Sequence, residues 1–366
     1  MTWSWKLGRV AEINVYVHAT FFILIGWIAL GYWEAEGSVL AVLRGIGFIL
    51  ALFACVLLHE LGHSLTARHY GIRTRRITLL PIGGIASLER MPEDPREEMI
   101  VALAGPAVNV VIALLIWFWI SVTGGFSPFD SLGITSGVPL ERLLVINIML
   151  AVFNMLPALP MDGGRVFRAA LAMRMDHYQA TQKAARLGQG FALFFVFMGL
   201  LYNPFLIFIG LFVWIGAATE LHTEQMKTVV AGVTVGEVMQ TDFKTLAGND
   251  YLSHVVELTL HGSQKDFPVL SGKDIVGVLT QADLLKGLTA KGNAARVDDW
   301  MQKGVKSIES SVQLQAYLET LSDPLLRLQL VTDHDRLVGI VDFDNFSEFV
   351  RIQTALNSTA ADEMRN

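Results

Sequence analysis

Charged residues are scarce in this sequence. Asp, Glu, Lys and Arg make up 17% of the 366 residues and hydrophobic residues make up 52%, whereas about 25% charged is usual for a soluble chain. The shortage is uneven, because residues 1–222 carry nearly equal numbers of acidic and basic side chains and residues 223–366 are clearly acidic. We therefore expect a membrane domain at 1–222 and a soluble domain after it.

Cysteine is almost absent, and there is no basic excess. Cys55 is the single cysteine, which excludes an internal disulfide and a multi-cysteine zinc site, so any metal must be held mainly by histidine and carboxylate. The net charge of −6 gives no indication of nucleic-acid binding. A cleavable signal peptide is not expected, because the first apolar stretch is too long and lacks a small-residue cleavage pattern.

Long apolar runs predict six membrane spans, since a helix needs about 20 apolar residues to cross a bilayer. Four runs cover residues 14–33, 45–67, 99–122 and 142–160. A fifth run, 187–219, is long enough for two short spans separated by a turn at Asn203-Pro204.

The loops between the spans differ in charge. Lys and Arg gather in 68–76 and 161–186, whereas the loop 121–140 has neither and is expected on the outside. Because basic loops stay on the cytoplasmic side, both termini are expected in the cytoplasm, in a multi-pass protein of the plasma (inner) membrane. We expect His177, in the second basic loop, to be solvated.

Residues 79–86, between the second and third spans, are apolar but too short to cross a membrane. Their glycines and proline disfavour a helix. One interpretation is a buried hairpin that covers the domain. The other is a re-entrant strand at membrane depth, whose exposed edge could pair with an unwound substrate.

The second span ends in His59-Glu60-Leu61-Gly62-His63. Positions i and i+4 share one face of a helix, so both imidazoles can reach one zinc ion, with Glu60 beside them to accept a proton from water. Zinc lowers the pKa of a bound water from 15.7 to about 7. The alternative is a hydrogen-bonded histidine pair that stabilises helix packing, but ionisable groups inside a span are costly and usually functional.

Asp162 is the best candidate for a third ligand, which catalytic zinc usually has. It closes the segment 154–162, in which two prolines break the fourth span, and the glycines that follow let the backbone turn. Asp162 would then arrive at the cytoplasmic side, where His59 and His63 also lie. The alternative role is a helix cap at the membrane surface.

These motifs together resemble the site-2 protease family of intramembrane metalloproteases, in its six-span branch with C-terminal CBS domains. The matching motifs are His59-Glu60-x-x-His63, Gly105-Pro106-x-x-Asn109, and Asn154, Pro157, Pro160, Asp162 and Gly163. The resemblance implies zinc ligation by His59, His63 and Asp162. It implies that Glu60 is the general base.

Two asparagines lie at membrane depth and need hydrogen-bond partners. We assign Asn154 to the site, as a donor to an oxyanion or to the substrate backbone, and Asn109 to helix packing; an interhelical link is the alternative for Asn154. His18 is expected to be a hydrogen-bonded interfacial residue rather than an auxiliary zinc ligand. Cys55, one turn before His59, is expected to be a packing residue.

The soluble part repeats itself at a constant offset of 62 residues. The matching pairs are Val235 and Val297, Met239-Gln240 and Met301-Gln302, and Gly277 and Gly339. Each repeat has a helical stretch (251–262 and 313–322) and two strands, which in the first repeat cover 267–270 and 275–279 and precede a helix at 281–288. Such a unit is too small to bury both sheet faces, so two should pack about a pseudo-twofold axis.

The repeat resembles a tandem pair of CBS domains, which we place at 233–290 and 295–356. In that family a Gly-x-x-Thr/Ser-x-x-Asp stretch holds the ribose of an adenine nucleotide, and the first repeat matches it with Gly277, Thr280 and Asp283. The second repeat departs from it, with Gly339, Asp342 and Asn345. The resemblance implies at most one site for an ATP- or AMP-type nucleotide, at Thr280 and Asp283. A pair that only dimerises or docks on the membrane domain is the alternative.

The sequence thus predicts a polytopic α-helical membrane domain of about six transmembrane helices, followed by a soluble α/β tandem CBS module. The expected function is zinc-dependent intramembrane cleavage of membrane-anchored proteins, modulated by a nucleotide at the CBS pair. The expected partners are the substrate, the lipid bilayer and a second copy of the chain, without nucleic acid. The alternatives are a CBS-regulated channel or transporter and an inactive membrane scaffold.

Overall fold

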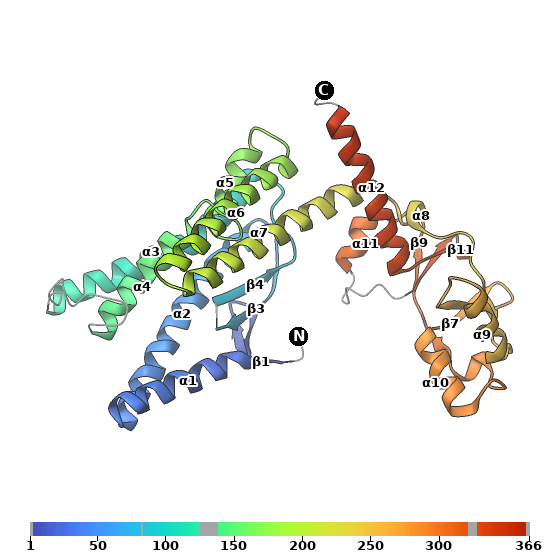
Figure 1. The fold of residues 1–366 in the computed structure, drawn as a ribbon, viewed down its shortest axis with the longest axis horizontal. Coiled ribbons are helices and arrows are strands. Elements are labelled where there is room, and N and C mark those ends of the chain that lie inside the picture. The colour runs from blue at the N-terminus through green and yellow to red at the C-terminus, as the bar shows by residue number, and fades with distance from the viewer. Residues whose placement is uncertain (1–2, 82, 125–137, 321–327, 364–366) are drawn as a thin grey trace. The chain divides into compact units, whose positions relative to one another are not determined.

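A computed structural model describes residues 3–81, 83–124, 138–320 and 328–363. The chain forms two compact units, Met1–Glu224 and Gln225–Asn366, whose elements are labelled in Figure 1. Part of the loop predicted to lie outside (125–137), residue 82 of the 79–86 segment and the end of the 313–322 helix fall outside the described residues.

Long helices build most of the N-terminal unit. They are α1 (Ala19–Glu36), α2 (Val39–His69), α3 (Pro95–Thr123), α4 (Pro139–Asn154), α5 (Asp162–Ala172), α6 (His177–Leu201) and α7 (Phe205–Val230). Among the described residues, α2, α3, α6 and α7 are long and apolar enough to cross a membrane. Large apolar side chains cover their outer faces, such as Trp117, Phe118 and Trp119, each more than half exposed. Such surfaces are rare on soluble proteins and suit contact with lipid.

The helices follow the predicted spans, with one error. Residues 14–18 belong to a strand, so the first helix begins at Ala19 and not near residue 14. The break that the prolines predict is confirmed, because α4 ends at Asn154, and so is the turn at Asn203-Pro204 between α6 and α7. Since α1 and α4, with 18 and 16 residues, are not among the four helices above, the count of six spans stays a prediction.

A four-stranded sheet packs against α2. Its order is β1-β2-β3-β4, with β1 (Ser4–Val10), β2 (Ile13–His18), β3 (Thr74–Leu80) and β4 (Gly83–Leu88). Ile77 and Leu79 of β3 are buried with Phe53 and Leu61 of α2, so β3 and β4 lie along this helix (Figure 1). The 79–86 segment is therefore part of the antiparallel β3–β4 hairpin, and β4 is the edge strand on the side opposite β1.

Two similar α/β halves build the C-terminal unit. The first half contains α8 (Val235–Val238), β5 (Leu246–Ala247), α9 (Leu252–His261), β6 (Phe267–Ser271), β7 (Asp274–Leu279) and α10 (Gln281–Lys291). The second contains β8 (Gln302–Lys303), β9 (Ser307–Glu309), α11 (Leu314–Thr320), β10 (Gln329–Asp333), β11 (Arg336–Val341) and α12 (Phe343–Glu363). The strands and helices predicted for the first repeat are confirmed by α9, β6, β7 and α10.

The two halves exchange equivalent contacts. Gln302 pairs with Val278 of the first half, and Gln240 pairs with Ile340 of the second. A Cβ on Gly277 would lie 3.0 Å from the sulfur of Met301, and one on Gly339 would lie 2.5 Å from that of Met239. Because these positions are related by the 62-residue offset, the contacts confirm the predicted pseudo-twofold packing.

Candidate metal centre

Three groups that can bind a metal come together in the N-terminal unit. One ligand atom each from His59, His63 and Asp162 lies within 4.8 Å of the others. The distances between His59 Nε2, His63 Nε2 and Asp162 Oδ2 are each 3.2 Å. Both histidines are buried on α2, and Asp162 is the first residue of α5. The structure thus brings together the three residues that the sequence nominated as ligands.

The spacing and chemistry of these atoms fit zinc. Bonds of about 2.0–2.2 Å in a tetrahedral arrangement put ligand atoms about 3.3–3.6 Å apart, and the 3.2 Å found here lies near the lower limit. Two imidazoles and a carboxylate also make up a known kind of catalytic zinc site, which keeps a fourth position open for water or substrate.

The far sides of both imidazole rings are fixed by hydrogen bonds from α3. His59 Nδ1 lies 3.1 Å from Asn109 Oδ1, and His63 Nδ1 lies 2.7 Å from the Val101 carbonyl oxygen. Because a carbonyl oxygen can only accept, each Nδ1 carries the proton and each Nε2 presents a lone pair to the cluster. Three electron-pair donors 3.2 Å apart repel one another unless a metal ion or a proton lies between them, and a metal ion satisfies all three at once. Asn109, which the sequence assigned to packing, therefore orients a candidate ligand.

A tight turn delivers Asp162 from the end of α4. The Met161 N–H donates to the Ala158 carbonyl, and the Gly164 N–H donates to the Met161 carbonyl. A Cβ on Gly163 would overlap the Met155 carbonyl oxygen, and one on Gly164 would overlap the backbone of Ala158. Both positions therefore need glycine, because only a residue without Cβ lets the turn close this tightly.

Glu60 is held beside the cluster by the edge strand. Its Oε2 accepts a hydrogen bond of 3.2 Å from the Ala86 N–H of β4. A Cβ on Gly84 would lie 2.6 Å from Glu60 Cγ, so the close approach of this strand to α2 also depends on a glycine. Glu60 is half-buried, and its carboxylate has one oxygen fixed while the other can meet a water molecule.

The remaining candidates are not members of the three-residue cluster. Asn154, the last residue of α4, is half-buried and its side chain makes no hydrogen bond within the described part of the chain. His18 caps the start of α1, with Nδ1 2.8 Å from Thr20 Oγ1, which confirms its prediction as a hydrogen-bonded residue. Cys55 is buried in α2, as expected for packing.

The N-terminal unit also contains a buried ion cluster, around Arg168 and Glu98, that was not predicted from the sequence. Arg168 and Glu98 are 2% and 0% exposed and form an ion pair. His177 is half-buried between Glu98 and Glu224, so the prediction that it is solvated is wrong. The loop charges indicated orientation only, because the partners of these basic residues come from distant helices. Acidic residues at the ends of two apolar helices, Glu98 and Glu224, were the available signal.

Thr280 and Asp283 form a hydrogen-bonded pair at the start of α10. Thr280 Oγ1 donates to Asp283 Oδ2 at 2.6 Å, and Gln302 Nε2 donates to the same oxygen at 2.7 Å. Burial raises the pKa of Asp283, but the hydrogen bonds from Thr280, Gln302 and Lys286 lower it overall. The carboxylate is therefore ionised at neutral pH and can accept from a hydroxyl group. In the second half, Asp342 Oδ1 caps α12 by accepting from the Asn345 N–H at 2.8 Å.

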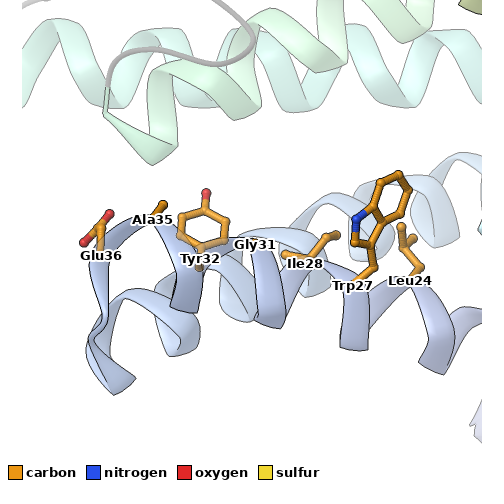
Figure 2. A pocket seen from close by; sticks show the side chains of 7 residues that line it. All are labelled: Leu24, Trp27, Ile28, Gly31, Tyr32, Ala35 and Glu36. Carbon is orange, nitrogen blue, oxygen red and sulfur yellow. The ribbon is translucent and has the colours of Figure 1, made fainter.

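An open groove of about 410 Å³ runs along α1. It is lined by Leu24, Trp27, Ile28, Gly31, Tyr32, Ala35 and Glu36 (Figure 2). Gly31 and Ile28 lie between Trp27 and Tyr32 along the helix (Figure 2). None of the candidate site residues lines this groove.

Both parts of the chain match known protein families. A family model described as peptidase family M50 matches residues 47–136 and 130–199, and a CBS domain model matches 235–290. A zinc metalloprotease of Methanocaldococcus jannaschii is 31% identical over 307 residues, which cover 83% of this chain and 84% of that protein. A protein of Synechocystis is 31% identical over 358 residues, 92% of this chain and 93% of that protein.

A solved structure is also similar to part of the chain. The site-2 protease from Methanocaldococcus jannaschii has 34% sequence identity and a TM-score of 0.45, with 60% of this chain and 95% of that chain covered. The chain is a multi-pass membrane metalloendopeptidase that belongs to peptidase family M50, the site-2 proteases, and carries a C-terminal pair of CBS domains.

Proposed function

We propose that the enzyme uses zinc to cut membrane-anchored proteins within their transmembrane segments. The observation that carries this proposal is the triangle of His59, His63 and Asp162 ligand atoms, 3.2 Å apart, beside Glu60 on an apolar helix long enough to span a membrane.

The proposed roles follow from the positions of the side chains. His59, His63 and Asp162 would hold zinc, which when bound supplies a Lewis acid that makes water nucleophilic at neutral pH. Glu60 takes the proton from the attacking water and returns it to the leaving amine nitrogen. The Ala86 N–H keeps the Glu60 carboxylate in place for both transfers. Asn154 donates to the substrate backbone once substrate is bound.

The edge strand β4 supports cleavage of an extended peptide. A helical segment hides its carbonyl groups in internal hydrogen bonds, so it must unwind before cleavage. An unwound segment can add to the edge of β4, which pairs with no further strand among the described residues, through main-chain hydrogen bonds beside the one that Ala86 donates to Glu60. Because β4 carries Ala86, which contacts Glu60, an added strand would run directly past the general base.

Removal of zinc should stop cleavage reversibly. We expect purified full-length protein in liposomes to cut a single-span reporter protein, to lose this activity after dialysis against a zinc chelator, and to regain it with one equivalent of zinc. Appearance of the cleavage fragments measures the activity, and their mass spectra locate the cut within the span. Cleavage that persists in fully metal-free protein would contradict the proposal.

We place six spans in the plasma (inner) membrane, with both termini and the CBS module in the cytoplasm and domain limits at 1–222, 233–290 and 295–356. The support is the gathering of basic residues in 68–76 and 161–186. Since Cys55 is the single cysteine and is buried, cysteines introduced in each loop can be labelled one at a time. If a cysteine in the 68–76 loop were labelled from outside intact cells, the proposed orientation would be wrong.

We further propose that the first CBS repeat binds an ATP- or AMP-type nucleotide and that two chains pair through their CBS modules. Asp283→Ala should weaken nucleotide binding about tenfold or more, because a hydrogen bond to a charged group contributes roughly 1.5–3 kcal/mol. Calorimetric titration of the full-length protein with ATP and AMP measures this. Asn345→Ala, at the equivalent position of the second repeat, is the control and should bind as the wild type. If Asp283→Ala and Asn345→Ala bound nucleotide with equal affinity, this site would be excluded.

The proposed dimer is tested separately, by the mass of the detergent-solubilised protein.

A further inference from the structure

The helix that carries Asp162 is anchored by a deeply buried ion pair. α5 has 11 residues and begins with Asp162, and Arg168 lies six residues further along it, about 9 Å along the helix axis. The side chain of Arg168 is 2% exposed, and that of its partner Glu98 on α3 is 0% exposed. Burial of two charges is costly unless their geometry is good and their hydrogen bonds are satisfied.

All three nitrogens of the Arg168 guanidinium group donate hydrogen bonds in this cluster. Its Nε donates to Glu98 Oε1 at 2.8 Å, and its Nη2 donates to the same oxygen. Its Nη1 donates to Glu220 Oε1 on α7 at 2.8 Å. The second oxygen of Glu98 lies 3.4 Å from His177 Nε2. A planar guanidinium bound in this way fixes direction as well as distance, which a lysine cannot do.

The two residues of the pair lie on helices that position the candidate metal ligands: Glu98 on α3 and Arg168 on α5. Glu98 is three residues before Val101, whose carbonyl fixes the His63 ring, and α3 also carries Asn109, which fixes the His59 ring. Arg168 is on the helix that begins with Asp162. The pair therefore joins the helix that orients the two imidazoles to the helix that brings the carboxylate.

We infer that Arg168 and Glu98 are positioning residues that set the Asp162 carboxylate against the two imidazoles and so determine zinc affinity. This inference rests on the proposed zinc site. A purely structural pair would change stability and leave the affinity of the folded protein alone. A positioning pair changes the affinity even when stability is preserved, because the carboxylate is then free to shift by a fraction of an ångström.

A double variant separates the two roles. Glu98→Gln/Arg168→Met removes both charges at nearly constant volume, while Glu220 keeps Arg165 and His177 keeps Glu224 as partners. The melting temperature of the metal-free protein should therefore stay close to that of the wild type. Zinc affinity should fall about 10- to 100-fold, as for other residues that orient metal ligands. Competition with a chromophoric chelator measures it on full-length protein in detergent. Arg90→Met, on the exposed Arg90–Glu93 pair, is the control and should change neither value.

A conservative variant keeps the inference testable if the double variant does not fold. Arg168→Lys retains the charge but not the planar fork, and it should also weaken zinc binding by about tenfold or more. Wild-type zinc affinity in either folded variant would overturn the inference. If the wild-type protein itself binds no zinc, the proposed function fails instead, so the two failures are distinguishable.

Discussion

Glu60→Gln is expected to abolish peptide cleavage and to leave zinc binding intact. Glutamine has the size of glutamate and keeps an oxygen that can accept from the Ala86 N–H, now 3.2 Å from Glu60 Oε2. It cannot take a proton from water. Because general acid–base catalysis contributes about 10²- to 10⁴-fold, kcat should fall by at least this factor. Cleavage of a single-span reporter in liposomes and the zinc content of the same preparation measure both effects.

Glu93→Gln provides the matched control. Its carboxylate is 86% exposed and pairs only loosely with Arg90, at 3.7 Å, so the same chemical change there should leave cleavage unaltered. Proteolysis at the wild-type rate in Glu60→Gln would remove Glu60 from the mechanism. Loss of zinc together with activity would instead mean that Glu60 maintains the structure of the site, and the role of general base would have no support.

The core of the candidate site could be predicted because its signals are local in sequence. His59 and His63 are one helical turn apart on a helix whose apolar character is evident from composition, so a shared face follows from helix geometry. Asp162 could be predicted as a ligand from the prolines and glycines around it, which interrupt an apolar run. The structure brings its oxygen to 3.2 Å from both imidazoles, a distance that no spacing rule supplies.

The groups that orient these ligands could not be predicted in the same way. Asn109 is 50 residues from His59, and Val101 is 38 residues from His63. Ala86 contacts Glu60 through its backbone N–H, a group that every residue except proline carries. Such contacts depend on how α2, α3 and β4 pack, and helix packing is fixed by side-chain fit across the interface rather than by any local pattern.

The error in the first span has a simple physical cause. In residues 13–18 the buried Ile13, Val15 and Val17 alternate with Asn14, Tyr16 and His18, which is the period of a strand. Because an apolar helix follows immediately, average hydropathy joined the two elements into one run. The period of two would have separated them, since a helix does not place every second residue on one face.

Arg168 shows a different limit. A count of Lys and Arg over 161–186 correctly describes a basic segment, but the burial of Arg168 depends on acidic partners elsewhere in the sequence. These partners are Glu98, 70 residues earlier, and Glu220, 52 residues later. The same basic residue is therefore an indicator of loop orientation in the sequence and a buried link between three helices in the fold.

Gly105→Ala is expected to destroy zinc binding while the fold remains intact. A Cβ at this position would overlap His63 Nε2 and lie 2.7 Å from His59 Nε2, so the added methyl group would occupy the space next to both ligand atoms. Misplacement of a reacting group by about 1 Å can cost 10²-fold in rate, and here both ligand atoms must move. We expect less than one zinc per chain and a fall in cleavage of about 10²-fold or more, measured by metal analysis and by the reporter assay.

Helix propensity does not oppose this substitution, because alanine is favoured over glycine inside a helix by about 0.5–1 kcal/mol. α3 should therefore be no less stable on its own, and a loss of zinc cannot be attributed to a weakened helix. Gly47→Ala in α2 is the matched control, since a Cβ there meets nothing within 4 Å, and it should keep both zinc and activity. Normal zinc content in Gly105→Ala would mean that the ion does not sit between His59, His63 and Asp162. Glu60→Gln should keep zinc and lose only cleavage, so zinc content and cleavage measured on both variants separate ligation from proton transfer.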